Sequence, residues 1–179
     1  MAVFVNTFFE ARVERLLDLA ELVERIFSSA GLDYRIVGGL AAYLYVEELD
    51  PDAGRLTRDI DIAVRREDLD RIAKAAQPFG LEPRHEAGID MLVQAAKPSG
   101  GSAVHLVFAG APELGSYRIV KGLRLTPLED LVRMKLTSFR AKDEAHLKDL
   151  DEAGLITPDV EAGLSPALTQ RLAQLRARG

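Results

Sequence analysis

Apolar residues recur at two different spacings along the chain, and each spacing predicts one kind of element. A three-to-four-residue rhythm with few breaks is typical of amphipathic helices, and short apolar runs bounded by glycine, proline and charged residues are typical of strands. The helices predicted in this way span 8–29, 40–48, 67–78, 126–153 with a break near Arg140, and 167–178. The predicted strands span 33–37, 59–64, 81–87, 90–96 and 102–109.

The order of these elements predicts an α/β (α+β) fold with a mixed sheet. Two of the links between strands are short enough for antiparallel hairpins, whereas the earlier strands are separated by helices. A T-x-x-E pattern at Thr7 predicts a capping box at the start of the first helix. We expect three parts: 1–31 as an N-terminal helix packing on the core, 32–125 as the α/β core, and 126–179 as a C-terminal helical region.

Composition narrows the functional classes. The 179 residues are 47% hydrophobic and 28% charged, enough for one domain with a core. There is no cysteine, which excludes disulfides and thiol chemistry. The longest apolar run, 36–46, is too short to span a membrane, and the N-terminus lacks a signal-peptide pattern, so we expect a cytoplasmic protein. The net charge of −5 argues against a broad nucleic-acid-binding surface.

A glycine pair and a pair of aspartates carry the strongest chemical signal. Gly38 and Gly39 follow an apolar strand and begin a helix, where backbone N–H groups can meet a polyanion. Asp59 and Asp61 lie two residues apart on the next strand, so their side chains point the same way. Neighbouring carboxylates repel each other unless a cation lies between them. The pattern predicts a metal–nucleotide site; the alternative is a charged, solvated end of a strand.

A lysine in the later helical region supports the same interpretation. Lys135 falls in the middle of an apolar helical stripe, so its amine either reaches out to water or points inward to a pocket. The segment after it is dense in charge, which is typical of a solvated helix surface or of a phosphate-binding one. Its charged or titratable residues are Arg140, Lys142, Asp143, His146 and Asp149.

These motifs resemble the nucleotidyltransferase superfamily. The segments VGGLAAYLY, RLTRDIDIAV and MKLTSFRAKDEAHLKDL, within about 34–155, are most similar to the branch that includes the AbiEii-type toxins of bacterial toxin–antitoxin systems. The resemblance implies that Asp59 and Asp61 hold Mg²⁺ or Mn²⁺ and that Lys135 offsets charge on an NTP. It also implies phosphate contacts from the glycine pair and nearby residues, and a later acidic motif at Asp143 or Asp149. The implied phosphate-binding residues are Gly38, Gly39, Thr57, Arg58, and Arg140 or Lys142.

One position departs from the family pattern. Catalytic members place a third carboxylate on a later strand, and here His105 occupies that place. A neutral imidazole can ligate a transition metal but is a poor partner for Mg²⁺, which favours oxygen. We therefore count His105 as a metal-ligand candidate, and Asp90 on the adjacent predicted strand as a possible substitute for the missing acid.

The resemblance implies metal-dependent transfer of a nucleoside monophosphate from an NTP to an acceptor. That acceptor could be an RNA end, a protein or a small molecule, and an antitoxin-like protein could be a partner. The alternatives are a catalytically degenerate relative that binds nucleotide or a protein partner, and a metal-dependent hydrolase using the same acids. The glycine pair argues against the hydrolase, which has less need of a phosphate-binding helix start. The oligomeric state is open.

Overall fold

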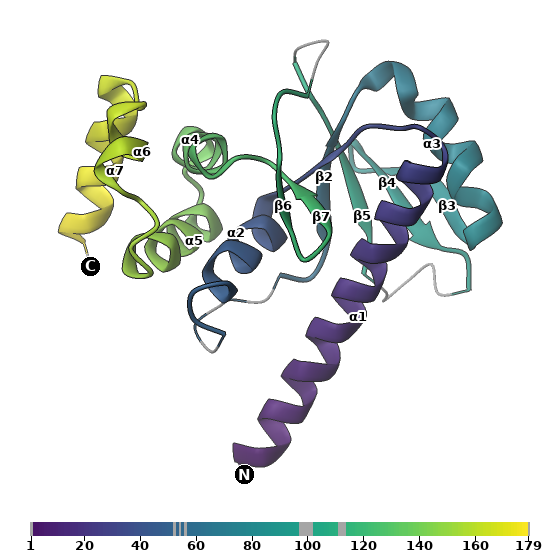
Figure 1. Cartoon of the computed structure of the whole chain (residues 1–179), viewed down its shortest axis with the longest axis horizontal. Helices are drawn as coiled ribbons and strands as arrows, with labels where there is room; N and C mark the ends of the chain where they lie inside the picture. The colour runs from purple at the N-terminus through teal and green to yellow at the C-terminus, as the bar shows by residue number, and fades with distance from the viewer. Residues whose placement is uncertain are drawn as a thin grey trace.

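The computed structural model of the chain describes residues 2–51, 53, 55, 57–96, 102–110 and 114–178, with side chains from Ala11 onward. Its described strands form one seven-stranded sheet in the order β3-β4-β5-β2-β1-β7-β6. Strand β1 runs antiparallel to β2 and parallel to β7, and β2 runs parallel to β5. The predicted mixed sheet within an α/β fold is confirmed (Figure 1).

Each predicted helix and strand is present, and the elements follow one another in the predicted order. The strands are β1 Arg35–Val37, β2 Ile60–Val64, β3 Leu81–Glu86, β4 Ile89–Gln94, β5 Val104–Phe108, β6 Arg118–Val120 and β7 Leu123–Leu125. The α-helices are α1 Ala2–Ser29, α2 Gly38–Glu47, α3 Leu69–Ala76, α4 Leu128–Ser138, α5 Ala141–Glu152, α6 Pro158–Ala162 and α7 Pro166–Ala177. Two 3₁₀ turns, Arg66–Asp68 and Gln77–Phe79, flank α3.

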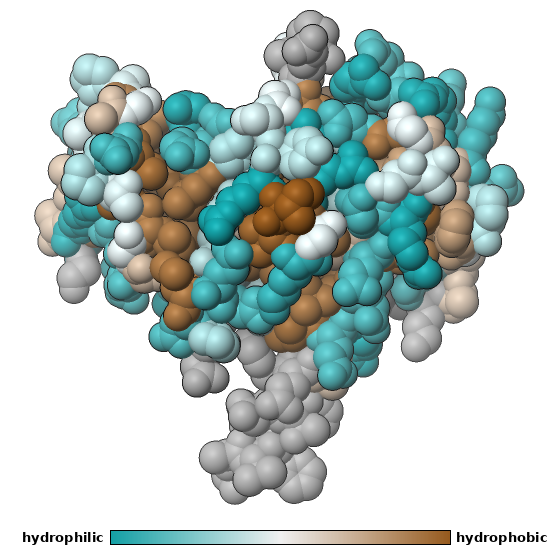
Figure 2. All heavy atoms as spheres, in the orientation of Figure 1, coloured by the Kyte–Doolittle hydropathy of each residue, from teal (hydrophilic) through white to brown (hydrophobic). Residues whose placement is uncertain are grey.

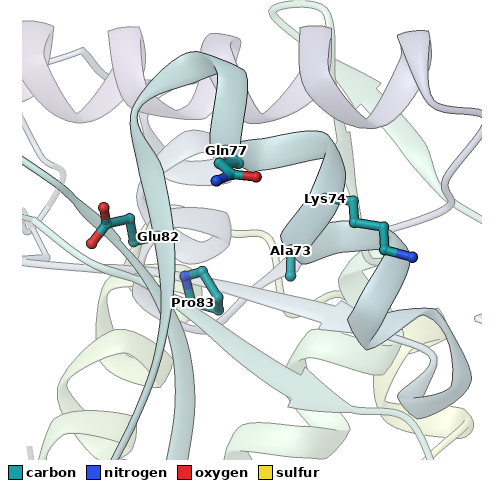
Figure 3. A pocket seen from close by; sticks show the side chains of 5 residues that line it. All are labelled: Ala73, Lys74, Gln77, Glu82 and Pro83. Carbon is teal, nitrogen blue, oxygen red and sulfur yellow. The ribbon is translucent and has the colours of Figure 1, made fainter.

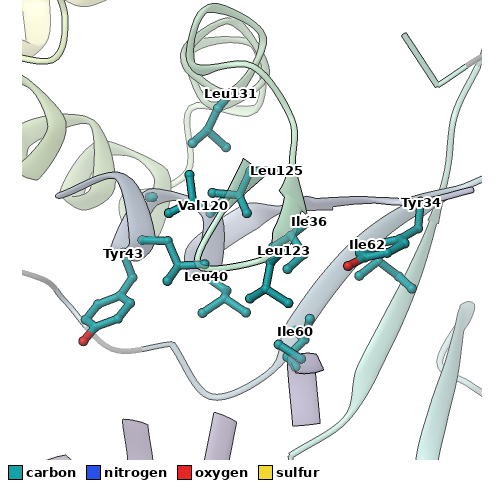
Figure 4. Packing of buried hydrophobic residues seen from close by; sticks show 14 of the residues in the cluster. Tyr34, Ile36, Leu40, Tyr43, Ile60, Ile62, Val120, Leu123, Leu125 and Leu131 are labelled. Atoms are coloured by element: carbon teal, nitrogen blue, oxygen red, sulfur yellow. The ribbon is translucent and has the colours of Figure 1, made fainter. Parts of the chain in front are cut away.

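The core lies on one face of the sheet and around α2. Along β2, Ile60, Ile62 and Val64 are buried, while Asp61 and Ala63 on the other face are half-buried. Helix α2 is buried along nearly its whole length because it packs against β1 and β2 as well as α4 and α5. Figure 4 shows Leu40 of α2 among the apolar side chains of the sheet.

Helix α1 is longer than the sequence pattern predicts. It begins at Ala2, so Thr7 lies inside the helix and the predicted capping box at its start is wrong. Once a helix is nucleated, each added residue gains a hydrogen bond at little cost, so the helix continues past an internal cap signal. Its later turns pack on α3 and β7, and its N-terminal end projects away from the sheet (Figure 1).

A short hairpin and a short helix were missing from the prediction. Strands β6 and β7 are three residues each, joined by a turn at Lys121 and Gly122, both at positive φ. Their place in the sheet depends on the parallel pairing of Leu125 with Ile36, which no local pattern reveals. Helix α6 has five residues, too few for a periodic signal.

The predicted start of α4 is shifted by two residues. The sequence pattern predicts a helix from residue 126, but the helix begins at Leu128 after Pro127. Thr126 is buried, and its N–H donates to the carbonyl of Ile36 at 3.0 Å. It therefore belongs to the sheet rather than to the helix. The predicted break near Arg140 is confirmed, because α4 ends at Ser138 and α5 begins at Ala141.

None of the helices in the described part of the chain is both long and apolar enough to cross a bilayer. Figure 2 shows a face dominated by hydrophilic side chains, with separate apolar patches between them. The three-part division of the chain at 31 and 125 stays a prediction.

Candidate active site

Asp61 lies in the middle of the sheet, on the face opposite the core. In the strand register it stands between Val37 of β1 and His105 of β5. Nδ1 of His105 is 3.0 Å from Oδ1 of Asp61, and both side chains are about one quarter exposed. Because Ile60 and Ile62 anchor the strand from the buried face, the position of Asp61 is set by the sheet itself.

Asp59 lies one residue before β2 and is held by a backbone N–H one residue before the neighbouring strand β5. Its Oδ1 accepts a hydrogen bond from the N–H of Ala103 at 3.0 Å. The hydroxyl of Thr57 donates to the carbonyl oxygen of Asp59 at 3.3 Å. Asp59 and Asp61 are both only partly buried, as a site open to a ligand requires.

The two glycines are needed because their neighbours leave no room for a side chain. Gly38 has φ +69°, and a Cβ built on it would lie 2.1 Å from Oδ2 of Asp61. A Cβ on Gly39 would lie 2.8 Å from Cβ and Oγ1 of Thr57 and 3.2 Å from Cε1 of His146. The start of α2 therefore lies against Asp61 on one side and His146 of α5 on the other.

The first turn of α2 is a potential anion site. Its N-cap residue, Val37, makes no side-chain capping bond, and the turn carries no acidic residue. The first N–H groups of a helix lack intrahelical partners and carry partial positive charge. A phosphate at this position would lie next to Asp61 and Thr57, because both contact the glycines.

Lys135 points inward, as one of the two interpretations of its place in an apolar stripe predicted. Its side chain is 4% exposed, and Nζ lies 3.0 Å from Nδ1 of His146 and 3.8 Å from Oδ1 of Asp143. Burial lowers the pKa of Lys135 to about 8, although the negative charges of Asp143 and Asp61 oppose the shift. Because the charge of Asp61 acts on the pKa of Lys135, the amine lies within electrostatic reach of Asp61.

Asp143, rather than Asp149, belongs to this cluster. Burial opposes the ionisation of Asp143, but hydrogen bonds from Arg140 and Ser138 outweigh it and lower the pKa of the carboxyl group. Arg140 Nε and Ser138 Oγ both donate to Oδ2 of Asp143 at 2.8 Å. Asp149 instead accepts from Arg55 at 2.9 Å.

Two predicted phosphate contacts are outside this buried cluster. Arg58 and Lys142 are exposed, and Arg140, although bound to Asp143, has a side chain that is 62% exposed. The backbone N–H of Arg140 also donates to Oδ2 of Asp143 at 3.3 Å, and the N–H of Asp143 donates to the carbonyl of Arg140 at 2.8 Å, which together stabilise the start of α5. Arg140 thus has a structural role that the sequence motif did not indicate.

His146 is the site residue that sequence reasoning did not assign. The sequence shows it only as part of a charge-dense segment, yet it contacts Lys135 and lies 3.2 Å from the Cβ position of Gly39. Burial and the charge of Lys135 lower the pKa of His146 to about 4, so the ring is neutral at pH 7. Its spacing of 11 residues from Lys135, across a helix break, gave no signal of contact.

Asp90 does not replace the missing third carboxylate. It pairs with Leu106, which in turn pairs with Ile62, so Asp90 faces the core side of the sheet and Asp61 the other. Its Oδ1 lies 2.8 Å from Nδ1 of His85. In register with Asp61 and His105, the next position on β4 is Met91.

The donor set at the aspartates fits a metal that is shared with a nucleotide better than a metal in a closed protein cage. Among the described residues, no group of three or more His, Cys, Asp or Glu side chains lies close enough together to hold a metal ion. Each aspartate uses Oδ1 in a contact with the protein, which leaves Oδ2 of Asp59 and Asp61 for another ligand. Mg²⁺ is commonly held by one or two carboxylates plus substrate phosphates, so these residues fit it.

A separate surface hollow of about 360 Å³ lies between α3 and β3. Figure 3 shows its lining, which contains one cation and one carboxylate: Ala73, Lys74, Gln77, Glu82 and Pro83. None of these side chains belongs to the cluster around Asp61 and Lys135. The hollow offers no feature that suggests chemistry.

Solved structures reveal what the sequence comparisons do not. No family model and no curated protein matches the chain. It is similar to an antigenic nucleotidyltransferase-like protein from Paracoccidioides brasiliensis, with a TM-score of 0.61 and 19% identity over 92% of this chain and 88% of that one. The chain has a nucleotidyltransferase fold.

Two further structures agree on this nucleotidyltransferase fold. ANT(2")-Ia, solved in complex with adenylyl-2"-tobramycin, gives a TM-score of 0.57 and 13% identity over 90% of this chain and 97% of that one. The Megavirus polyadenylate synthase gives 0.58 and 12% identity, covering 86% of this chain and 36% of that one. At these identities the likeness concerns the fold.

Proposed function

We propose that this protein transfers a nucleoside monophosphate from an NTP to an acceptor. One observation carries the proposal: the first turn of α2, free of acidic residues and of a side-chain cap, is pressed directly against Asp61. A buried amine, Lys135, lies on the neighbouring helix. A polyphosphate needs N–H donors and a cation, and a metal bound to it needs carboxylates, and this cluster offers all three.

Each group has a role in that reaction. The N–H groups of Gly38 and Gly39 and the hydroxyl of Thr57 bind the β- and γ-phosphates, and Lys135 offsets their charge. Asp59 and Asp61 hold Mg²⁺ or Mn²⁺, which when bound neutralises charge that develops on the phosphate oxygens. Arg140 is exposed enough to reach a phosphate from the rim of the site.

The wider setting is proposed from the sequence motifs alone. The AbiEii-like segments support a bacterial protein related to toxin–antitoxin systems, with an antitoxin-like partner and a place in the cytoplasm. The acceptor is an RNA end, a protein or a small molecule. The adenylyl-tobramycin bound to ANT(2")-Ia makes a small molecule worth testing first.

The test is transfer of label from α-³²P-NTPs to tRNA, protein and aminoglycoside acceptors. Asp61→Asn is expected to lower the rate about 100- to 1,000-fold, because it removes a charge that the transition state needs, while the fold stays intact. Asp90→Asn is a matched control, since Asp90 also pairs with a histidine but on the opposite face of the sheet. Equal transfer by wild type and Asp61→Asn would contradict the assignment.

A second candidate function is nucleotide or partner binding without catalysis. The contact between His105 and Asp61 favours it, because it engages an oxygen of one of the two carboxylates and puts an imidazole where the resemblance implies an acid. Calorimetry with NTPs, with and without Mg²⁺ or Mn²⁺, separates the two candidates. Metal-dependent binding supports transfer, and metal-independent binding supports the second candidate.

A further inference from the structure

His146 occupies the junction between the start of α2 and the inward-pointing lysine. Its Nδ1 is 3.0 Å from Nζ of Lys135, and its Cε1 lies 3.2 Å from the Cβ position of Gly39. An ammonium group can only donate hydrogen bonds, so Nδ1 must be the acceptor and the ring proton is assigned to Nε2. The ring therefore links α5, α4 and α2 at one point.

We propose that His146 is a positioning residue of the nucleotide site, which holds the ammonium of Lys135 beside the glycine turn without neutralising its charge. This inference rests on the proposed function and adds to the site one residue beyond the aspartates, the glycine pair and Lys135. It assigns to a neutral ring the place where a carboxylate would be the more usual partner of a buried lysine.

The chemistry of the alternatives explains why the partner is neutral. Asp143 is the nearest carboxylate to Lys135, but its Oδ2 is engaged by Arg140 and Ser138, and Oδ1 is 3.8 Å from Nζ. The close hydrogen bond of Lys135 thus goes to the imidazole. An uncharged acceptor fixes the direction of the amine and leaves its positive charge available to a triphosphate.

Burial keeps the imidazole neutral. Together with the charge of Lys135 it lowers the pKa of His146 to about 4. A protonated ring could not accept from an ammonium group, so the hydrogen bond and the neutral state support each other. The ring also lies beside the first turn of α2, where a Cβ at position 39 would be 3.2 Å from Cε1 of His146, so only glycine accommodates the ring there without a shift.

Substitutions that keep or remove the acceptor test the role. His146→Asn places an amide oxygen close to the position of Nδ1, His146→Ala removes the acceptor, and His146→Asp adds a charge that neutralises the lysine. The matched control is His85→Ala, since His85 also contacts a charged side chain, that of Asp90, but its own side chain is 62% exposed on the edge strand β3. Thermal melting of each variant checks that it is folded.

The probes are ATP with Mg²⁺ and inorganic tripolyphosphate, measured by calorimetry on the full chain. His146→Ala is expected to bind both about tenfold more weakly, the size of one hydrogen bond to a charged group. His146→Asp should bind at least as weakly as His146→Ala, and His146→Asn should stay within about threefold of wild type. In steady-state transfer the loss should appear in KM rather than in kcat.

The outcomes distinguish this proposal from the proposed function. If wild type binds ATP and His146→Ala binds it equally well, or if His146→Asn loses as much as His146→Ala, the role of His146 is overturned. Wild-type-like binding by His146→Asp has the same consequence. If wild type binds neither probe, the nucleotide site itself is wrong, and the positioning role fails with it. Binding without transfer overturns only the transfer reaction.

Discussion

The candidate site has two halves that are built in different ways. The sheet-borne half consists of Gly38, Gly39, Asp59 and Asp61, and backbone geometry fixes it: strand register, a positive φ and close contacts. The helix-borne half consists of Lys135, Asp143 and His146, and side-chain hydrogen bonds within a buried cluster fix it. The first half presents half-exposed acids, and the second presents a buried base.

This difference determines how each half should respond to change. The half fixed by the backbone is closely packed around its glycines, so even one added methyl group must displace an aspartate or a strand. A half fixed by hydrogen bonds can exchange one acceptor for another. Its interaction with a nucleotide should change when the charge of one of its side chains changes. Steric variants should therefore act mainly on the folded state, whereas charge variants and pH should act mainly on nucleotide binding.

Gly38→Ala tests the claim for the sheet-borne half and should give the largest effect on stability. The new Cβ meets Oδ2 of Asp61 at 2.1 Å, in a conformation at φ +69° that alanine rarely adopts. We expect the free energy of unfolding to fall by about 3 kcal/mol or more, combining backbone strain with overpacking. Urea denaturation measures it.

The matched control for this prediction is Gly154→Ala. Gly154 has φ +72°, almost the same backbone conformation, but no atom lies within 4 Å of its Cβ position. Its substitution should cost only the backbone penalty, about 1 kcal/mol. Equal losses at the two glycines would mean that the contact with Asp61 contributes nothing, and the sheet-borne half would then be less rigid than we describe.

The sequence could predict the sheet-borne half because its signals are local. An apolar strand, a glycine pair and two aspartates at a spacing of two define the geometry within one β-α-β segment, and the structure places them together. The inward direction of Lys135 was also predictable as one of two readings of an apolar stripe. The fold class followed from the same alternation of helix and strand signals.

The parts of the site and fold that the sequence did not predict depend on contacts between segments that are distant in the chain, or on elements too short to give a pattern. The hydrogen bond between Lys135 and His146 crosses a helix break at Phe139, whose φ of +47° has no glycine to signal it in the sequence. Whether Asp90 could join Asp61 depended on strand register, which a shift of one residue would have reversed. The hairpin β6–β7 is too short to give a periodic pattern.

The pH dependence of nucleotide binding tests the helix-borne half and should give an intermediate effect. The pKa of Lys135 is lowered from 10.5 to about 8, so affinity for ATP should fall as the pH rises from 7 through 8 to 9. Losing the charge-assisted contact should weaken binding up to about tenfold. Lys135→Met should bind weakly at all these pH values and show little slope.

Stability should move in the opposite direction over the next pH interval. Below about 8, Lys135 is protonated in both the folded and the unfolded state and adds no slope. Between about 8 and 10.5 the unfolded chain binds the extra proton, so the free energy of unfolding gains a contribution that rises with pH. The difference in free energy of unfolding between wild type and Lys135→Met, measured at each pH, isolates that contribution. A difference that fell over this interval would contradict the lowered pKa.

A turn outside both halves should give the smallest effect and shows whether stability and binding are separable. Ala87, at φ +51°, and Gly88 form the two-residue turn between β3 and β4, where asparagine is favoured. Ala87→Asn should therefore raise the free energy of unfolding by about 0.5–1 kcal/mol and leave ATP affinity unchanged.

Lys121→Asn makes the same backbone change in the β6–β7 turn but removes the ion pair with Glu47, so its free energy of unfolding should rise less. A change in ATP affinity in Ala87→Asn would show that the sheet-borne half senses the edge of the sheet, and its rigidity would then not be local to the contacts around Asp61.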